Sequence, residues 1–194
     1  MDYPLGVGHL QKLAWEVGVP ERSLRRAVSA GTLRCRRPSP RRLEVSAAER
    51  AYLRNHWELL ARLRAVLRTE PNVGFAAIFG SLARGDERAD SDLDLAVEFR
   101  QRDRRGRNRL AGKLEAASGR RVQMLHLRDI EECAPDLLRE IVLEGRVLVD
   151  RDKRWPGLLR ERRQILQRAK QADKQLQAAE RKAIARFERA AASS

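Results

Sequence analysis

The 194-residue chain has few of the features that mark secreted, membrane-bound or zinc-binding proteins. Its two cysteines, Cys35 and Cys133, are far apart and fit no metal-ligand spacing, so we expect two reduced thiols. No stretch approaches about eighteen consecutive apolar residues, and no charged-then-apolar signal segment opens the chain. These absences predict a soluble, cytoplasmic protein without a membrane partner, and the length permits one domain or two small ones.

Acidic residues are scarce at both ends of the chain, whose overall formal charge is +14. Residues 1–69 hold 14 basic and 6 acidic side chains, residues 70–150 hold 14 and 16, and residues 151–194 hold 13 and 5. The basic excess therefore flanks a nearly neutral middle. Such asymmetry is typical of flanks that bind a polyanion, and an arginine-rich genome is an alternative source of part of it.

The middle of the chain contains the most informative pattern. Phe75–Phe79 is an apolar run short enough for a buried strand, and it ends at Gly80-Ser81, where the backbone can approach a phosphate and turn into a short helix. Asp92 and Asp94 then open a second strand on which alternate residues share a face, about 6.5 Å apart. Two carboxylates with that spacing can ligate a pair of Mg²⁺ ions.

With Gly80-Ser81, Arg84-Gly85 and the spaced Asp92 and Asp94, this stretch resembles the signature of the DNA polymerase β-type nucleotidyltransferases. Its brevity resembles the minimal nucleotidyltransferase subfamily, which includes many prokaryotic antitoxins. The alternative interpretation is two surface acids in a loop after a strand, which the flanking strand and the Gly-Ser pair disfavour.

The resemblance implies an activity and a set of roles. An acceptor oxygen would attack the α-phosphate of a nucleoside triphosphate, with ATP the favoured donor and Mg²⁺ or Mn²⁺ as the metal. Asp92 and Asp94 would be the catalytic, metal-binding residues. Gly80 would permit close backbone approach to the nucleotide, and Ser81 and Arg84 would contact its phosphates.

One position departs from this family pattern. The third carboxylate usually lies on the next strand in a Val-Asp-like pair, and the matching pair here is Val122-Gln123. A glutamine amide cannot ionise, so it cannot serve as a general base. This departure leaves three alternatives. Either another acid such as Glu98 or Asp129 reaches the site, or two carboxylates suffice for catalysis, or the domain binds nucleotide with little turnover. Glu98 lies about 13 Å along the strand from Asp94, which makes it a poor substitute.

Residues 13–28 resemble a helix-turn-helix, with a glycine in the turn and Pro20 at the opening of the second helix. The second helix would present Arg22, Arg25 and Arg26 outward, as a recognition helix does in the major groove of duplex DNA. The alternative is a small helical cap whose arginines are only solvated.

Residues 32–45 predict a β-hairpin that resembles the wing of a winged helix. Its proline-rich tip is flanked by four arginines, Arg36, Arg37, Arg41 and Arg42. A basic helix and a basic hairpin together favour DNA binding over the helical cap. A capping box at Ser46–Glu49 then opens a helix that runs to about Thr69.

The remaining pattern completes an α+β fold class. We expect an exposed loop over Arg100–Arg109, and then a helix, a strand, a second helix and an edge strand at the ranges Leu110–Ala117, Val122–Leu127, Pro135–Glu144 and Arg146–Val149. The predicted organisation is therefore a winged helix-turn-helix DNA-binding domain with its linker helix (1–69), a minimal polymerase β-like nucleotidyltransferase core with a mixed sheet (70–150), and a long basic helix (151–194).

The sequence of the C-terminal helix allows two packing arrangements. Its narrow, alanine-rich seam fits a solvated helix packed at one end as well as a homodimer through a coiled coil.

Two compatible functions follow. The first is an enzyme that transfers a nucleoside monophosphate to a partner protein, since the resemblance includes antitoxins that adenylylate a toxin encoded nearby. The second is a DNA-binding regulator whose nucleotidyltransferase domain is weak or inactive. A small-molecule nucleotidyltransferase is less favoured, because a DNA-binding domain would be superfluous in it.

Overall fold

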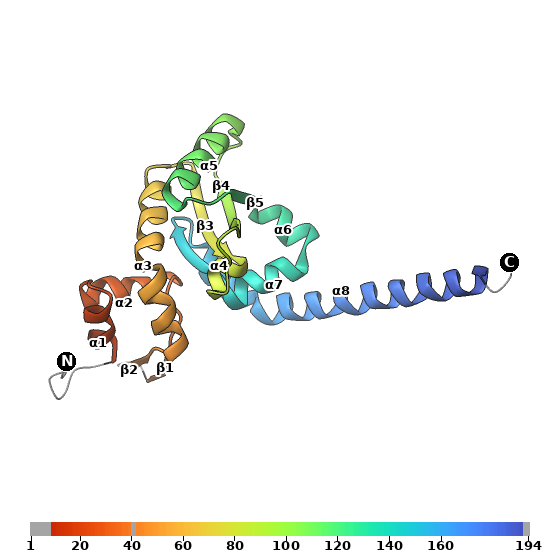
Figure 1. Cartoon of the computed structure of the whole chain (residues 1–194), viewed down its shortest axis with the longest axis horizontal. Coiled ribbons are helices and arrows are strands. Elements are labelled where there is room, and N and C mark those ends of the chain that lie inside the picture. The colour runs from red at the N-terminus through yellow and green to blue at the C-terminus, as the bar shows by residue number, and fades with distance from the viewer. Residues whose placement is uncertain (1–8, 40–41, 192–194) are drawn as a thin grey trace.

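The computed structural model describes the backbone of residues 9–39 and 42–191 and shows an α+β architecture (Figure 1). Helices α1 (His9–Glu16) and α2 (Glu21–Ala30) are joined by a turn in which Gly18 has φ +70°. Strands β1 (Arg36–Ser39) and β2 (Arg42–Glu44) then pair antiparallel. The two helices and the hairpin lie where the sequence predicts them. Arg41 and the side chain of Arg42 lie outside the described part of the chain.

Helix α3 (Ala47–Arg68) connects this N-terminal part to the sheet. The hydroxyl of Ser46 accepts a hydrogen bond from the Glu49 backbone N–H at 3.1 Å, which confirms the predicted cap. Leu53, Leu63 and Leu67 on α3 are fully buried in the same apolar cluster as residues of α1, α2 and the sheet. The N-terminal helices and the sheet therefore share one core.

The central sheet has four strands in the order β5-β4-β3-β6. They are β3 (Val73–Phe79), β4 (Leu93–Phe99), β5 (Val122–His126) and β6 (Arg146–Asp150). Strand β4 pairs antiparallel with β3 and parallel with β5, while β6 lies antiparallel at the edge beside β3. The predicted mixed sheet and edge strand are confirmed.

Helices cover both faces of the sheet. Helices α3 and α5 (Arg104–Ser118) lie on one face, and α6 (Leu127–Cys133) and α7 (Pro135–Glu144) lie on the other, as the two apolar clusters divide them. The predicted loop over Arg100–Arg109 is wrong in its second half, because the Asp103 carboxylate accepts the Gly106 N–H at 2.9 Å and starts α5 at Arg104. Helix α6 was not expected from the sequence.

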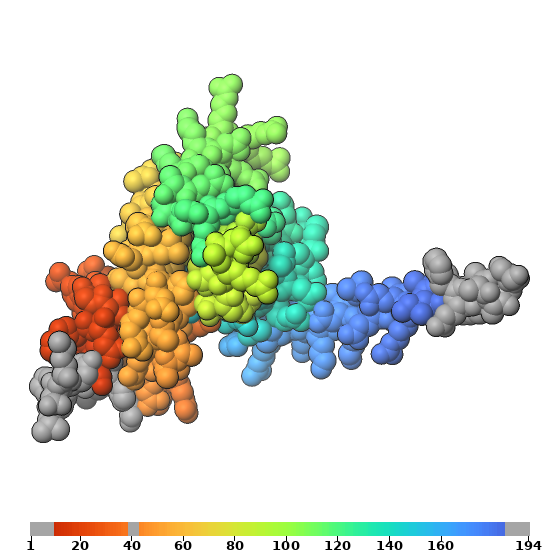
Figure 2. All heavy atoms as spheres, in the orientation of Figure 1, coloured from red at the N-terminus to blue at the C-terminus, as the bar shows by residue number. Residues whose placement is uncertain are grey.

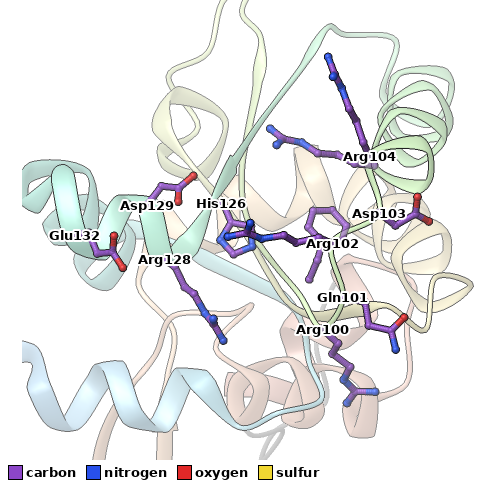
Figure 3. A pocket seen from close by; sticks show the side chains of 11 residues that line it. Arg100, Gln101, Arg102, Asp103, Arg104, His126, Arg128, Asp129 and Glu132 are labelled. Carbon is purple, nitrogen blue, oxygen red and sulfur yellow. The ribbon is translucent and has the colours of Figure 1, made fainter.

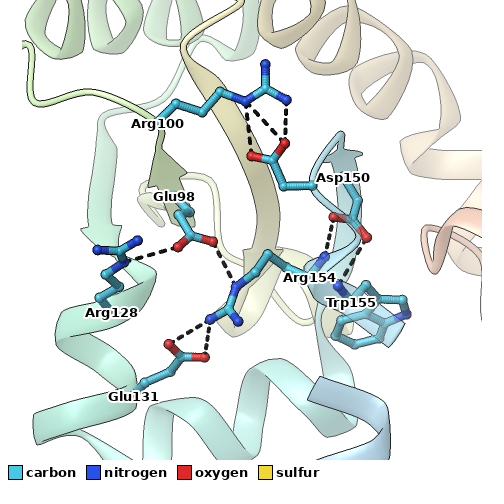
Figure 4. Close-up of polar contacts among 8 residues, drawn as sticks. Glu98, Arg100, Arg128, Glu131, Asp150, Arg154 and Trp155 are labelled. Atoms are coloured by element: carbon cyan, nitrogen blue, oxygen red, sulfur yellow. Dashed lines mark hydrogen bonds and ion pairs between the residues drawn. The ribbon is translucent and has the colours of Figure 1, made fainter. Parts of the chain in front are cut away.

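Helix α8 (Arg154–Ala191) leaves the body of the protein as a long rod (Figures 1 and 2). The Asp150 carboxylate accepts the Arg154 and Trp155 backbone N–H groups at 2.8 and 3.1 Å and so caps its start (Figure 4). Three seam residues, Leu158, Ile165 and Ala169, are buried, whereas Leu176 further along is 60% exposed. The start of the helix is thus packed against the rest of the chain, and a homodimer through the remainder of the seam stays a prediction. None of the described helices is both long and apolar enough to cross a bilayer.

A buried arginine connects the two halves of the molecule. Arg146 on β6 is 1% exposed, and its guanidinium donates to the Glu49 carboxylate through Nη1 at 2.6 Å and Nη2 at 2.9 Å. Its Nε donates to the Ala83 carbonyl at 2.7 Å, and its Cζ lies 3.3 Å from the centre of the Tyr52 ring. Glu49 and Tyr52 lie on α3 and Ala83 lies after β3, so this one side chain joins the edge strand to two distant segments of the chain.

Removing this cation should destabilise the whole fold. Because Arg146→Met leaves the buried Glu49 carboxylate without its ion-pair partner, we expect the free energy of unfolding to fall by about 3–5 kcal/mol. Chemical denaturation would measure it. Lys113→Ala, which removes the exposed Lys113–Glu70 pair, is the matched control and should cost at most about 1 kcal/mol. Equal losses in the two variants would contradict a central role for Arg146.

Candidate active site

The candidate site lies where β4 begins. Asp94 is the second residue of β4 and is half-buried, and Asp92 lies one residue before the strand. Side chains alternate along a strand, so Asp94 and Ala96 share the face covered by α7. In the register of the sheet, Asp94 is opposite Phe79, the last residue of β3. The end of β3 and the start of β4 thus meet at one edge of the sheet.

Gly80 lies directly against the Asp94 carboxylate. It is the first residue of α4 (Gly80–Arg84) and has φ +73°, a backbone conformation that other residues adopt only with strain. A Cβ at this position would lie 2.4 Å from Asp94 Oδ2. Any other residue at position 80 would therefore strain the backbone and displace the Asp94 carboxylate.

Asp92 is held by an arginine that sequence reasoning missed. The Arg121 guanidinium donates to both carboxylate oxygens of Asp92, at 3.0 and 3.1 Å. A signal was present: Leu93 is the parallel partner of Val122, so the residues that precede these two also lie side by side. Arg121 is largely exposed, and it offsets the charge of Asp92 while Asp94 has no ion-pair partner among the described residues.

The Asp94 carboxyl carries the electrostatic cost of this arrangement. Burial raises its pKa, and the charges of Asp92 and Glu140 raise it further, whereas Arg84 lowers it. The pKa of Asp94 is thus higher in the folded state than in the unfolded state. At a pH above both pKa values the ionised carboxylate therefore lowers the stability of the fold, and its protonation at lower pH removes this loss. A bound divalent cation would relieve the same excess of negative charge at neutral pH.

Glu140 of α7 is the second residue that sequence reasoning missed, since nothing in the local pattern of a helix marks it. Its carboxylate pairs with Arg84, which also contacts Asp86 at 3.1 Å and Glu144 at 3.7 Å. Arg84, predicted to contact phosphates, therefore lies at the C-terminal end of α4 and is engaged by three acids. Ser81 lies in the first turn of α4 and is half-buried.

Gln123 occupies the position next to Asp94 on the neighbouring strand. The two residues are register partners in the parallel β4–β5 pair, so they lie on the same face. The other candidate acids lie elsewhere. The Glu98 carboxylate, further along β4, is bound by Arg128 at 3.2 Å and by Arg154 at 2.8 Å (Figure 4). Asp129 lies on α6, after the end of β5. Among the described residues, no three His, Cys, Asp or Glu side chains come together as a metal site. Asp92 and Asp94 are the fitting donors for a divalent cation.

The predicted DNA-contacting arginines lie on α2 and the hairpin. Arg22, Arg25 and Arg26 are exposed on α2, and Arg36 and Arg37 are exposed on β1. Arg25 donates to Glu21 one turn earlier at 2.7 Å, so part of its charge is already neutralised.

The mixed sheet, the Gly-Ser helix start against Asp94 and the Asp pair define a nucleotidyltransferase-like core. In agreement, residues 61–154 match the family model described as "Polymerase beta, Nucleotidyltransferase". A search of curated proteins found no significant match.

Solved structures give a likeness in fold. A mutant of the toxin–antitoxin pair MntA-HpeT is 20% identical, with a TM-score of 0.50 over 64% of this chain and 98% of that one. A toxin–antitoxin structure with AMP-PNP is 22% identical (TM-score 0.49; 64% and 98% covered). A tri-AMPylated Shewanella oneidensis HEPN toxin in complex with MNT antitoxin is 20% identical (TM-score 0.46; 65% and 96% covered). The likeness covers about two thirds of this chain and nearly all of each neighbour.

Adding a methyl group at Gly80 should disrupt nucleotide binding. In Gly80→Ala the new Cβ collides with the Asp94 carboxylate. We therefore expect Mg²⁺-ATP to raise the melting temperature of the native chain and to leave that of Gly80→Ala unchanged. The strained backbone should also cost about 1–2 kcal/mol of unfolding free energy. Gly18→Ala is the matched control, because Gly18 has φ +70° and nothing within 4 Å of its Cβ position. It should lose similar stability and keep the full ligand response; a full response in Gly80→Ala would contradict the assignment.

Proposed function

We propose that the chain is an antitoxin-like regulator that binds a metal–nucleoside triphosphate at the β3–β4 edge and transfers a nucleoside monophosphate to a partner protein. The observation that carries the proposal is the packing of the Gly80 backbone against the Asp94 carboxylate within the segment that matches the family model. Support for a toxin as partner comes from a neighbour of like fold that is the antitoxin of a toxin–antitoxin pair.

In this proposal each residue has a role. Asp92 and Asp94 would hold Mg²⁺ or Mn²⁺, and the bound ion would supply positive charge beside the phosphates and the attacking oxygen. Gly80 leaves room for the phosphates beside Asp94, and the Ser81 hydroxyl donates to them. Arg84 must exchange its contact with Glu140 for a phosphate oxygen before it can bind the triphosphate. ATP is the proposed donor.

Gln123 sets the expected rate. Because its amide stands beside Asp94 where an ionisable group would serve as base, we propose a slow enzyme that binds nucleotide well. The alternative is a regulator with no transferase activity, which the lack of an ionisable group at Gln123 would also explain. A small-molecule acceptor is a further alternative, but it would leave the basic flanks of the chain without a function.

A transfer assay tests the proposal. The full chain is incubated with Mg²⁺ and radiolabelled ATP, GTP, CTP or UTP, with and without the product of the neighbouring gene. We expect label from ATP on the partner, lost in Asp92→Asn and in Asp94→Asn and kept in Asp90→Asn, which changes an exposed acid of the same loop. Gln123→Asp should raise single-turnover rate more than nucleotide affinity, since the added group acts on the attacking oxygen. No label on any acceptor would overturn the enzymatic proposal. Faster transfer by the native chain than by Gln123→Asp would instead contradict the assignment of Gln123 to the position of the missing carboxylate.

We further propose that α2 and the β1–β2 hairpin bind duplex DNA. The favouring observation is the set of exposed arginines on two adjacent elements of the N-terminal part, Arg22, Arg25 and Arg26 on α2 and Arg36 and Arg37 on β1. Arg41 and Arg42 belong to the same proposed DNA-binding set on the evidence of the sequence alone. In this proposal α2 enters the major groove and the hairpin contacts the phosphate backbone.

Gel-shift titrations at several salt concentrations test DNA binding, with the full chain because α3 shares its core with the sheet. Arg25→Ala with Arg26→Ala should remove preference for the operator. Arg36→Ala with Arg37→Ala should weaken binding to all sequences and reduce the salt slope by about two. The control removes equal charge from α8, as Arg160→Ala with Arg162→Ala. If the control weakens binding as much, the interaction is non-specific and the proposal fails.

A further inference from the structure

We propose that the protein has a second ligand site, for a nucleotide, at the opposite end of β4 from the Asp pair. A cavity of about 740 Å³ opens where the parallel strands β4 and β5 end, between the start of α5 and helix α6 (Figure 3). Asp94 is the second residue of β4 and Phe99 is the last, so about 16 Å of strand separate the two places. The carboxyl ends of parallel strands, with helices departing to opposite faces, are a common place for ligand pockets.

The charge of the pocket suits phosphate. Its lining includes five arginines: Arg100, Arg102, Arg104, Arg107 and Arg128. Three of these are held in place, Arg100 by Asp152, Arg107 by the Met124 carbonyl at 2.6 Å and Arg128 by Glu98 at 3.2 Å. The Arg102 and Arg104 side chains have no partner among the described residues. In Figure 3, Arg102 extends from the loop before α5 in the direction of His126, while Arg128 comes from α6. Planar guanidinium groups of this kind bind phosphate oxygens in pairs.

The rest of the lining suits a base and a ribose. Phe99 and His126 place two rings side by side, with centroids 6.4 Å apart and planes tilted by 37°. His126 Nδ1 is buried without a hydrogen-bond partner among the described residues. Aromatic rings beside arginines are the stacking surface on which nucleic-acid bases bind. Asp129 and Glu132 on the α6 side supply carboxylates that can accept hydrogen bonds from ribose hydroxyls or a base amino group.

These three features together select the ligand class. A bare polyphosphate would leave the rings unused and would meet the two acids, and an uncharged aromatic compound would leave Arg102 and Arg104 without a counter-charge. A nucleotide uses all three parts of the pocket. Since the lining places arginines rather than paired carboxylates against the phosphate, this site should bind without a divalent metal, which distinguishes it from the Asp92 and Asp94 site.

The test measures binding of a fluorescent ADP analogue in EDTA, on the full chain carrying Asp92→Asn and Asp94→Asn so that the other site is silent. We expect saturable binding that unlabelled ADP displaces. Arg102→Ala with Arg104→Ala should raise Kd at least tenfold, and His126→Ala should raise it several-fold. Arg105→Ala with Arg109→Ala is the control, because it removes equal charge from exposed positions of α5 outside the pocket. Its Kd should change less than twofold.

Competitors and controls assign every outcome. Displacement by ADP far better than by adenosine or inorganic phosphate supports a nucleotide site. No binding in EDTA, equal weakening by the control pair, or equal displacement by inorganic phosphate overturns it. If an RNA octanucleotide competes at a much lower concentration than ADP, the ligand is a single-stranded nucleic acid, and the proposal of a free nucleotide is overturned. Melting temperatures of the three variants that equal that of the Asp92→Asn, Asp94→Asn background exclude misfolding as the cause of lost affinity.

Discussion

The Arg146 guanidinium is the contact on which the arrangement of the molecule depends. A buried cation is tolerated only when its donors are satisfied, and those of Arg146 are satisfied by the Glu49 carboxylate, by the Ala83 carbonyl and by the Thr32 carbonyl at 3.3 Å. These partners belong to α3, to α4 and to the end of the N-terminal helix pair. The edge strand therefore fixes the N-terminal part against the sheet. It also fixes the C-terminal end of α4, whose first residue is Gly80.

Because α4 is held at its end, its start is held against Asp94. A second arginine, Arg34 of the N-terminal part, also donates to the Ala83 carbonyl, at 3.1 Å. The residues that would bind DNA and the residues that would bind nucleotide are thus joined through one short helix. A change in the position of α4 on nucleotide binding would alter the contacts of both arginines, which supplies a physical route for coupling between the two proposed activities.

The local parts of the fold and of the site could be predicted, and the parts that depend on distant contacts could not. Helix Pro135–Glu144 was predicted residue for residue from its periodicity and the flanking glycine. The place of Gln123 beside Asp94 was implied by the family resemblance, through the Val-Gln pair. By contrast, Glu49 was predicted to complete a capping box, whereas its carboxylate binds Arg146 on β6. The spacing of residues along the chain predicts neither that contact nor the position of Glu140 near Asp92 and Asp94. Charge also misled locally: six arginines suggested a loop over the first turns of α5.

The use of arginine in the structure separates structural cations from those available to a ligand. Several donate to main-chain carbonyls, among them Arg151 to Glu70 and Arg68, at 3.0 and 2.9 Å, and Arg120 to Arg88 and Ser91, at 2.8 and 2.9 Å. Such residues satisfy the ends of helices and loops, and their positive charge is directed inward at carbonyl oxygens rather than at a partner. Net charge alone consequently overstates the surface available to a polyanion. What identifies a binding surface is an arginine without a carbonyl or carboxylate partner, beside groups of a different chemistry. Within the described residues, Arg102 and Arg104 meet that condition beside Phe99 and His126.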